Sequence, residues 1–186
     1  MNTDLNLGEA TLRRAKASDA ARLAEFGART FSDTFAAENT PEDIALYLGR
    51  TYGAVQQAAE IDNLAMATIL ADVDGRLAGF AQMRTGPAPA CVSGRAPIEL
   101  LRFYVDRPWQ GRGLARALME EVGAEVVRRD AGVIWLAVWE RNERAIAFYR
   151  KCGFRDVGSK TFTLGTDRQN DRVMARPVRS SPGDAA

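Results

Sequence analysis

The longest apolar run in the chain, VIWLAVW (Val133 to Trp139), is the feature that most restricts its fold. Seven consecutive apolar residues without polar alternation are expected for a strand covered on both faces. They are far too few for a membrane-spanning helix, which needs about 20. A helical segment, GRGLARALMEEVGAEVVRRD, precedes this run, and a strand segment, IELLRFYV (Ile98 to Val105), precedes the helix. Strand, helix and buried strand together predict a right-handed crossover between two parallel strands.

The helical segment has the pattern of a helix that lies on a sheet. Its apolar residues recur every four positions, at Leu114, Leu118, Val122 and Val126. Charged residues are expected on the other faces of the helix: Arg116, Glu120, Glu121, Glu125, Arg128 and Arg129. We therefore expect one apolar stripe against the sheet and a charged outer surface.

Turn and capping signals divide the rest of the chain into further elements. Pro41 follows a capping residue, Thr40, and Asp74-Gly75 joins two β-rich runs as a hairpin turn. The N-terminal half predicts a strand at 10–15, a helix capped by Ser18 that frays near Thr30, a helix from Pro41 towards Glu60 with a break near Gly49 or Gly53, and strands near 64–73 and 76–85. The rest predicts a loop at 86–97, a helix in NERAIAFYRKCGF that Asn142 begins and Gly153 ends, and an antiparallel strand pair in FRDVGSKTFTLG and DRVMARP.

Length and composition are typical of one folded domain. The 186 residues predict a single domain over 1–176 and a disordered tail over 177–186, which has little to bury. Basic and acidic residues number 25 and 24, a net charge of +1, so we expect no nucleic-acid binding. The start, MNTDLNLGEA, has neither a basic region nor an apolar segment, so we expect no secretory signal and a cytoplasmic protein.

The residue types also restrict the chemistry. The chain has no histidine, which excludes histidine-based triads, histidine general bases and most zinc sites. Its two cysteines, Cys91 and Cys152, lie far apart and in no metal-ligand spacing, so we expect reduced thiols, no metal and no acyl-enzyme. Any proton transfer must use a carboxylate, tyrosine, lysine, cysteine or water.

The segment QGRGLAR, between the strand and the helix of the crossover, has the features of an anion site. Gly111, Gly113 and Ala115 keep bulky side chains away from the unpaired N–H groups at the helix start, and Arg112 and Arg116 add positive charge. The spacing fits neither the nucleoside-triphosphate loop nor the dinucleotide fingerprint. A plain tight turn with solvated arginines is the alternative at this point.

Two segments resemble the signature motifs of the GNAT superfamily of acetyl-CoA-dependent N-acetyltransferases. The first is Gln110-x-x-Gly113-x-Ala115 after LLRFYV, and the second is NERAIAFYRKCGF, which begins about 30 residues later. The resemblance covers roughly residues 10–176. It implies an α/β (α+β) fold with six to seven mostly antiparallel strands, a splayed parallel pair at the centre, and about four helices.

The resemblance implies acetyl-CoA as cosubstrate and identifies the residues that would hold it. The pantetheine arm is expected along the strand at Phe103, Tyr104 and Val105, where a bulge parts the parallel strands. Asn142 is expected to contact the same arm, to cap its own helix, or to do both. The pyrophosphate is expected on Gln110, Gly111, Arg112, Gly113, Leu114, Ala115 and Arg116.

For catalysis the resemblance implies direct attack of an amine on the thioester. Tyr149 is the expected acid at the departing sulfur, with simple packing against pantetheine as the alternative. A backbone N–H near Phe103 is expected to stabilise the oxyanion. Glu99 is the expected general base, and the alternatives are a surface glutamate and a route through water alone.

The acceptor is the part that the sequence restricts least. The segment FSDTFAAENTPEDIALYL resembles the polyamine (spermidine/spermine) N-acetyltransferase branch, a match that is less specific than the two motifs. Two sets of residues are candidates for the acceptor site. The acids Asp33, Glu38, Glu42 and Asp43 could attract a cationic amine, or they could be ordinary charges at helix starts. The aromatic residues Phe31, Phe35 and Tyr47 could line the acceptor cavity, or they could belong to the core. The alternatives are protein or peptide N-terminal acetylation, small-molecule (antibiotic or amino-acid) acetylation, and a non-catalytic acyl-CoA-binding module. We expect the protein to be a monomer or a homodimer.

Overall fold

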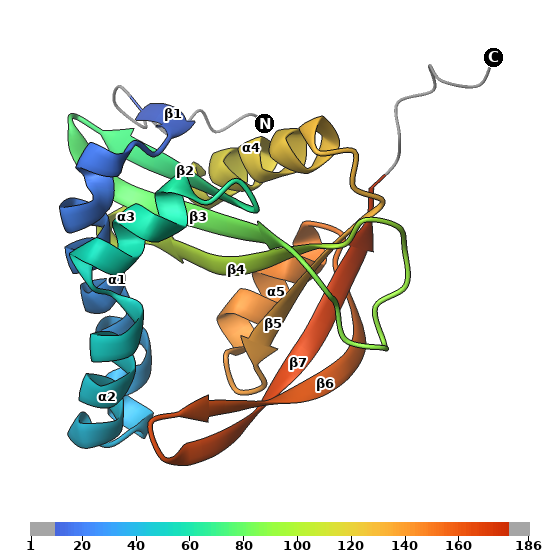
Figure 1. Cartoon of the computed structure of the whole chain (residues 1–186). Helices are drawn as coiled ribbons and strands as arrows, with labels where there is room; N and C mark the ends of the chain where they lie inside the picture. Colours follow the sequence, from blue (N-terminus) through green and yellow to red (C-terminus); the bar gives the residue numbers. More distant parts are fainter. Residues whose placement is uncertain (1–9, 179–186) are drawn as a thin grey trace.

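The computed structural model describes residues 10–178, which form a seven-stranded sheet with helices on both faces (Figure 1). The strands lie in the order β1-β2-β3-β4-β5-β7-β6, and only β4 and β5 are parallel neighbours. Their bounds are β1 Ala10–Arg14, β2 Met66–Val73, β3 Arg76–Thr85, β4 Ile98–Val105, β5 Val133–Trp139, β6 Arg155–Leu164 and β7 Asp167–Pro177. The predicted mixed, mostly antiparallel sheet is confirmed.

Within residues 10–178, five α-helices accompany the sheet, one more than the expected number of about four. They are α1 Ala20–Phe35, α2 Pro41–Thr51, α3 Ala54–Asp62, α4 Leu114–Arg128 and α5 Glu143–Lys151. The predicted second helix is divided at Tyr52 and Gly53, where the chain turns so that the Tyr52 ring packs directly against Gly27 of α1. A side chain at Gly27 would collide with that ring, so the glycine allows the two helices to approach.

The first helix differs from the prediction at both ends. Ser18 does not cap it, because Ser18 lies in a short 3-10 turn, Ala17–Asp19, and α1 begins only at Ala20. The helix does not fray at Thr30 but continues to Phe35. Thr30 is buried and its hydroxyl donates to the carbonyl of Phe26 at 2.8 Å, so packing holds the last turns of the helix in place.

The helices divide the core into two layers. On one face of the sheet, α4 buries Leu114, Leu118, Val122 and Val126 completely, which confirms the predicted stripe, and α5 packs beside it. On the other face, α1 and α2 pack around Phe80. No helix within residues 10–178 is long and apolar enough to cross a membrane.

The predicted boundary between the domain and its tail, at residues 176 and 177, lies close to the end of the described residues. Strand β7 ends at Pro177, and the N–H of Val178 donates to the carbonyl of Gly132 at 2.9 Å. The rest of the predicted tail, residues 179–186, lies outside the described residues, as do residues 1–9.

Strands β4 and β5 pair over only two positions, Ile98 with Ile134 and Glu99 with Trp135. Directly after them, a bulge at Leu101 shifts the register of β4 against β3. Figure 1 shows the two strands diverging from that point. The splayed parallel pair is therefore confirmed, and it leaves a gap in the middle of the sheet.

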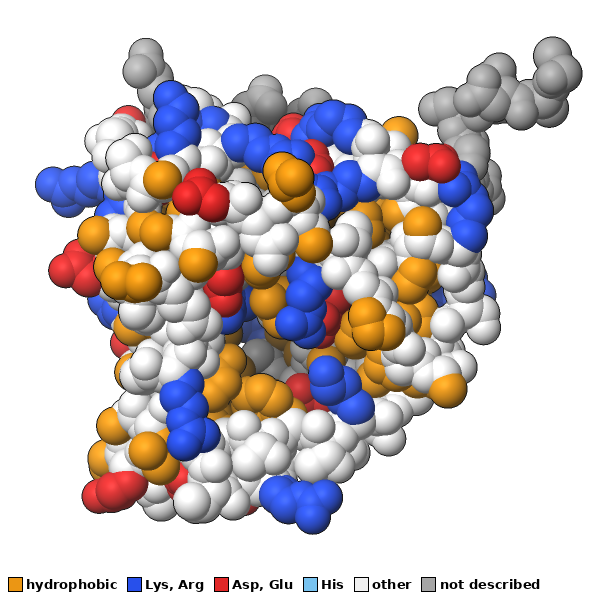
Figure 2. All heavy atoms as spheres, in the orientation of Figure 1, with side chains coloured by type: hydrophobic (Ala, Val, Ile, Leu, Met, Phe, Trp, Pro, Cys, Tyr) orange, Lys and Arg blue, Asp and Glu red, His pale blue; other side chains and the backbone are white. Residues whose placement is uncertain are grey.

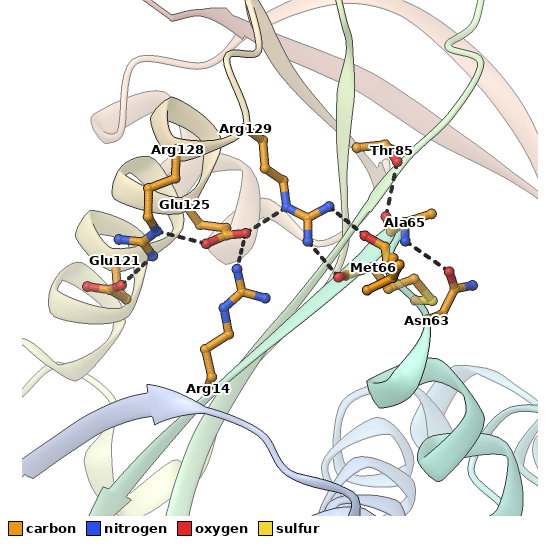
Figure 3. Close-up of polar contacts among 10 residues, drawn as sticks. Arg14, Asn63, Ala65, Met66, Thr85, Glu121, Glu125, Arg128 and Arg129 are labelled. Atoms are coloured by element: carbon orange, nitrogen blue, oxygen red, sulfur yellow. Dashed lines mark hydrogen bonds and ion pairs between the residues drawn. The ribbon is translucent and has the colours of Figure 1, made fainter.

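Glu125 contradicts the predicted charged outer surface of α4. Its side chain is only 1% exposed and accepts hydrogen bonds from Arg14 of β1, from Arg128 at 3.0 Å and from Arg129 at 2.6 Å (Figure 3). Arg129 also donates to the carbonyls of Leu64 and Met66. The end of α4 is thereby tied to β1 and to the start of β2.

We expect the Glu125→Gln substitution to lower the free energy of unfolding by about 1–3 kcal/mol, because three arginines lose a charged acceptor while remaining partly solvated. Burial would raise the pKa of Glu125, but the hydrogen bonds from Arg129, Arg14 and Arg128 outweigh it and lower the pKa. This stabilisation is present above the ordinary glutamate pKa and is lost as the pH falls through the lowered one. The difference between the two proteins in urea unfolding should therefore shrink in acid.

The matched control is Glu120→Gln on the same helix, where a side chain that is 66% exposed pairs with Arg116. It should change the free energy of unfolding by less than about 0.5 kcal/mol. Equal effects of the two substitutions would contradict the structural role of Glu125.

Candidate active site

A cavity of about 520 Å³ lies where β4 and β5 part. Its wall comes from α1 and α2, from β4 and the start of α4, and from β5, α5, β6 and β7. Figure 2 shows the molecule hollowed near the centre of this view, with hydrophobic side chains on the wall and Lys and Arg at the rim. The site residues predicted from the sequence that lie on this wall are Glu99, Phe103, Tyr104, Val105, Gln110, Gly111, Ala115, Asn142 and Tyr149.

The glycine segment forms a bare corner at the start of α4. Gly111 and Gly113 have φ of +77° and +89°, and a side chain at either position would meet nothing within 4 Å. The first N–H groups of α4 therefore lie beside open space, as an anion site at a helix N-terminus requires. Gln110 holds the segment to the strand, because its Nε2 donates to the Val105 carbonyl at 2.7 Å.

The other residues of this segment lie off the cavity wall. Leu114 points into the core and is fully buried. The guanidinium of Arg112 lies 5.5 Å from the ring centre of Trp109. Arg116 is 84% exposed and pairs with Glu120 at 3.0 Å. The two arginines are thus at the surface near the bare corner, where they have partners of their own.

The backbone of β4 turns polar groups toward the gap. The N–H of Asp106 donates to the Ala78 carbonyl at 2.8 Å, so Asp106 is bonded to β3. Backbone groups alternate between the two edges of a strand, so those of Phe103 and Val105 point away from β3 and into the gap. The Phe103 side chain packs against Phe148 of α5 at a ring distance of 5.5 Å.

Tyr149 lies on α5, whose first turn is fixed by Asn142. The Asn142 Oδ1 accepts from the N–H of Ala145 at 3.1 Å, which confirms the predicted cap. Tyr149 is 8% exposed and packs edge-on against Phe103 and Phe154. Burial raises its pKa well above the usual value, so the phenol is protonated at neutral pH.

Glu99 lies at the closed end of the gap, where β4 still pairs with β5. It is 6% exposed, so it is not the surface glutamate of the alternative interpretation. Both hydrogen bonds from Arg84 reach the same carboxylate oxygen, at 2.9 Å from Nε and 2.6 Å from Nη2. Glu99 is therefore paired with a guanidinium through one of its two carboxylate oxygens.

The expected acceptor residues divide into two groups. Phe31, Phe35, Tyr47 and Asp33 line the cavity, and the three aromatic rings also belong to the core, with Phe31 and Tyr47 stacked at 4.4 Å. Glu38, Glu42 and Asp43 do not line the cavity. Asp43 instead accepts from the N–H of Thr166 at 2.5 Å and from its hydroxyl at 3.0 Å, and so joins α2 to the β6–β7 turn.

The part of the cavity wall that β5, β6 and β7 supply was not predicted from the sequence. Trp139, Asp171 and Lys160 are direct partners across the three strands, and partners in adjacent antiparallel strands point to the same face. Phe162 and Gln169 continue this face, and all five side chains line the cavity. The sequence signal that could have revealed Asp171 is the alternation in β7, because Asp171 lies on the same face of the strand as the buried Val173 and Ala175.

Asp171 is the unusual member of this wall. It is 7% exposed, and its Oδ1 has no hydrogen-bond partner among the described residues. Burial raises its pKa to about 6; the positive charge of Lys160 opposes this shift and the negative charge of Glu140 adds to it. Within residues 10–178, no three Cys, Asp or Glu side chains are grouped to hold a metal ion.

Comparison with known proteins agrees with this geometry. Residues 22–154 match the model of the acetyltransferase (GNAT) family. An uncharacterised N-acetyltransferase of Mycobacterium bovis is 34% identical over 161 residues, 87% of this chain and 99% of the relative, and another, of Lactobacillus delbrueckii subsp. lactis, is 32% identical over 149 residues, 80% and 86%. The crystal structure of the PaiA N-acetyltransferase of Thermoplasma acidophilum in complex with coenzyme A has a TM-score of 0.71 at 22% identity, over 91% of this chain and 99% of that one. The chain belongs to the acetyltransferase (GNAT) family of acetyl-CoA-dependent N-acetyltransferases.

Proposed function

We propose that the protein binds acetyl-CoA in the gap between β4 and β5 and transfers the acetyl group to a primary amine that attacks it directly. The observation that carries this proposal is the unpaired edge of β4. The N–H and C=O groups of Phe103 and the N–H of Val105 point into a cavity that ends at the bare N-terminus of α4, while the Val105 carbonyl accepts from Gln110. An amide-bearing arm along the strand and an anion at the helix start match these two features.

The proposed cofactor site uses the whole predicted set. The pantetheine arm bonds to the backbone at Phe103, Tyr104 and Val105. Asn142 caps α5 through Oδ1, and its Nδ2 group donates to the same arm. The pyrophosphate accepts from the backbone of Gln110, Gly111, Arg112, Gly113, Leu114, Ala115 and Arg116, with the two arginines at its rim.

In the proposed reaction the amine nitrogen attacks the thioester carbon, and the N–H of Phe103 stabilises the oxyanion. Tyr149 then gives its proton to the departing sulfur. A buried phenol of raised pKa is a weaker acid than a thiol, so the proton moves only as the C–S bond breaks and negative charge gathers on sulfur. Neither cysteine lies on the cavity wall, which favours direct attack over an acyl-enzyme.

The charges of the cavity favour an acceptor with one amine and an apolar body. Its wall carries the acids Asp33, Glu99, Asp106 and Asp171 and the bases Arg102, Arg107, Arg144 and Lys160. A polyamine would meet as many basic side chains as acidic ones, so it is the less favoured acceptor. The aromatic wall suits a peptide N-terminus, an amino acid or another small amine with an apolar or aromatic body.

The proposal is tested by release of free thiol from acetyl-CoA in the presence of an amine panel. The panel contains 2-phenylethylamine, amino-acid amides, an N-terminal peptide, an aminoglycoside and spermidine. We expect turnover with an apolar amine at a kcat/KM at least tenfold above that for spermidine. A protein that binds CoA but releases no thiol with any amine would be a binding module, and the proposal would be wrong.

Tyr149→Phe should lower kcat by about 100-fold and leave the Kd for CoA unchanged, because the ring still packs but no proton is available for sulfur. Steady-state kinetics with the best amine of the panel and calorimetric titration with CoA measure the two quantities. Unchanged turnover would remove Tyr149 from the mechanism and support the packing alternative.

Gly111→Ala should weaken CoA binding about tenfold or more, since a side chain there enters the open corner and disturbs a charge-assisted hydrogen bond worth about 1.5–3 kcal/mol. Gly75→Ala is the matched control: Gly75 has φ of +73°, also meets nothing within 4 Å, and lies in the β2–β3 turn. The two substitutions impose similar backbone strain. Equal Kd values for CoA in both variants would argue against the pyrophosphate site.

A further inference from the structure

The buried carboxylate of Asp171 has no role in the cofactor site, and nothing in its own strand explains it. An unpaired carboxylate oxygen at 7% exposure is costly to bury, so such a group usually has a ligand or a catalytic task. The side chain faces the cavity beside Trp139 and Lys160. It is therefore a polar group without a partner on the wall of a binding site.

Strand register places Asp171 level with Phe103 along the length of the gap. Glu99 pairs with Trp135, and Asp171 pairs with Trp139, four residues further along β5. Phe103 is likewise four residues beyond Glu99 on β4. At about 3.3 Å per residue, and with one residue taken up by the bulge, Asp171 and Phe103 lie about 10–13 Å beyond Glu99 along the strands.

We propose that Asp171 is the general base of the reaction and takes a proton from the acceptor's ammonium group. This inference rests on the proposed acetyl transfer and adds the residue that prepares the nucleophile. Glu99 is the weaker candidate on two grounds. It lies at the closed end of the gap, and the Arg84 guanidinium is bonded to one of its two carboxylate oxygens.

The surroundings of Asp171 agree with this role. The charge of Asp171 interacts with Lys160 on β6, Glu140 after β5 and Tyr47 on α2. On β4, Arg102 also lines the cavity, but it is bound to Glu60 at 2.6 Å. A carboxyl whose pKa burial raises to about 6 is ionised at neutral pH and is a stronger base than an ordinary aspartate.

The ammonium nitrogen of the acceptor loses two protons in each acetyl transfer. The first passes to Asp171, which becomes a neutral acid. The neutral amine forms the C–N bond, and the C–S bond breaks as Tyr149 protonates sulfur. The second nitrogen proton leaves when the amide forms and restores Tyr149 through water. Asp171 then releases its proton to solvent, so one proton is produced for each acetyl group transferred.

The aromatic rings around Asp171 indicate what kind of acceptor the cavity would hold. An amine held at Asp171 extends its body over Trp139, Phe35, Phe162 and Tyr47, whose rings meet at centroid distances of 5.8 Å between Phe35 and Trp139 and 5.7 Å between Tyr47 and Phe162. The inferred acceptor is thus a monocationic primary amine attached to an apolar or aromatic group.

The test compares pH profiles of kcat/KM for the wild type, Asp171→Asn and Asp171→Glu, with acetyl-CoA and the best amine of the panel. The wild type should show an acid limb near pH 6. Asp171→Asn should be at least 100-fold less active at pH 7 and should lack that limb, gaining about tenfold per pH unit as the amine itself deprotonates. Asp171→Glu should restore part of the activity together with an acid limb.

Three comparisons separate the outcomes. Asp156→Asn, on exposed β6, should leave the profile unchanged, and Glu99→Gln should keep the acid limb whatever its activity. Asp171→Asn should bind CoA normally and unfold at the same or a higher temperature, which excludes misfolding. A limb near pH 6 that is retained in Asp171→Asn, or lost in Glu99→Gln, would overturn the inference while leaving acetyl transfer intact. Absence of turnover in the wild type would overturn the proposed function and this inference with it.

Discussion

The separation of β4 from β5 is the constraint on which the rest of the structure depends. One extra residue at Leu101 ends the pairing of these strands after Glu99 and Trp135. An unpaired strand edge inside a protein is costly, because its N–H and C=O groups lose water without gaining partners. The free edge of β4 at Phe103 can accept an extended, amide-bearing ligand, and the pantetheine arm of the proposed complex would pair with it.

The same gap joins the two faces of the sheet. Tyr149 and the Phe103 side chain lie in the layer of α4 and α5, whereas Asp171 and Trp139 lie on the face toward α1 and α2. In the proposed reaction the thioester lies between them, so the acid approaches sulfur from one layer and the base approaches nitrogen from the other. A closed sheet would keep these groups apart.

Features that depend on local sequence were predictable. Strands β4 and β5 have the predicted bounds, Asp74 and Gly75 form the predicted turn, and Asn142 caps α5, since each depends on residues close in the chain. The features that the sequence did not predict depend on distant residues. Glu125 is buried in an ion pair with Arg14, which is 111 positions away in the chain. Helix α1 continues beyond Thr30 because its last turns pack in the core.

The candidate site shows the same division. The signature segments identified the cofactor half, because the strand, the glycines and the capping residue are contiguous in the chain. Asp171 could not be recognised in this way, since its burial arises from pairing with β5 and β6 and from the cover of α1 and α2. The pKa of a carboxyl group is shifted by the residues that surround it in space, and around Asp171 most of these residues are distant in the sequence.

The bond between Asp43 and Thr166 affects how acceptors can be exchanged. It clamps α2 to the β6–β7 turn across 123 positions of chain, and Gly165 leaves no room for a side chain between them. The bond therefore resists separation of the aromatic residues of α1 and α2 from those of β6 at this corner. In related enzymes with this clamp, we expect acceptor preference to change through the side chains of the cavity wall more than through the path of the backbone.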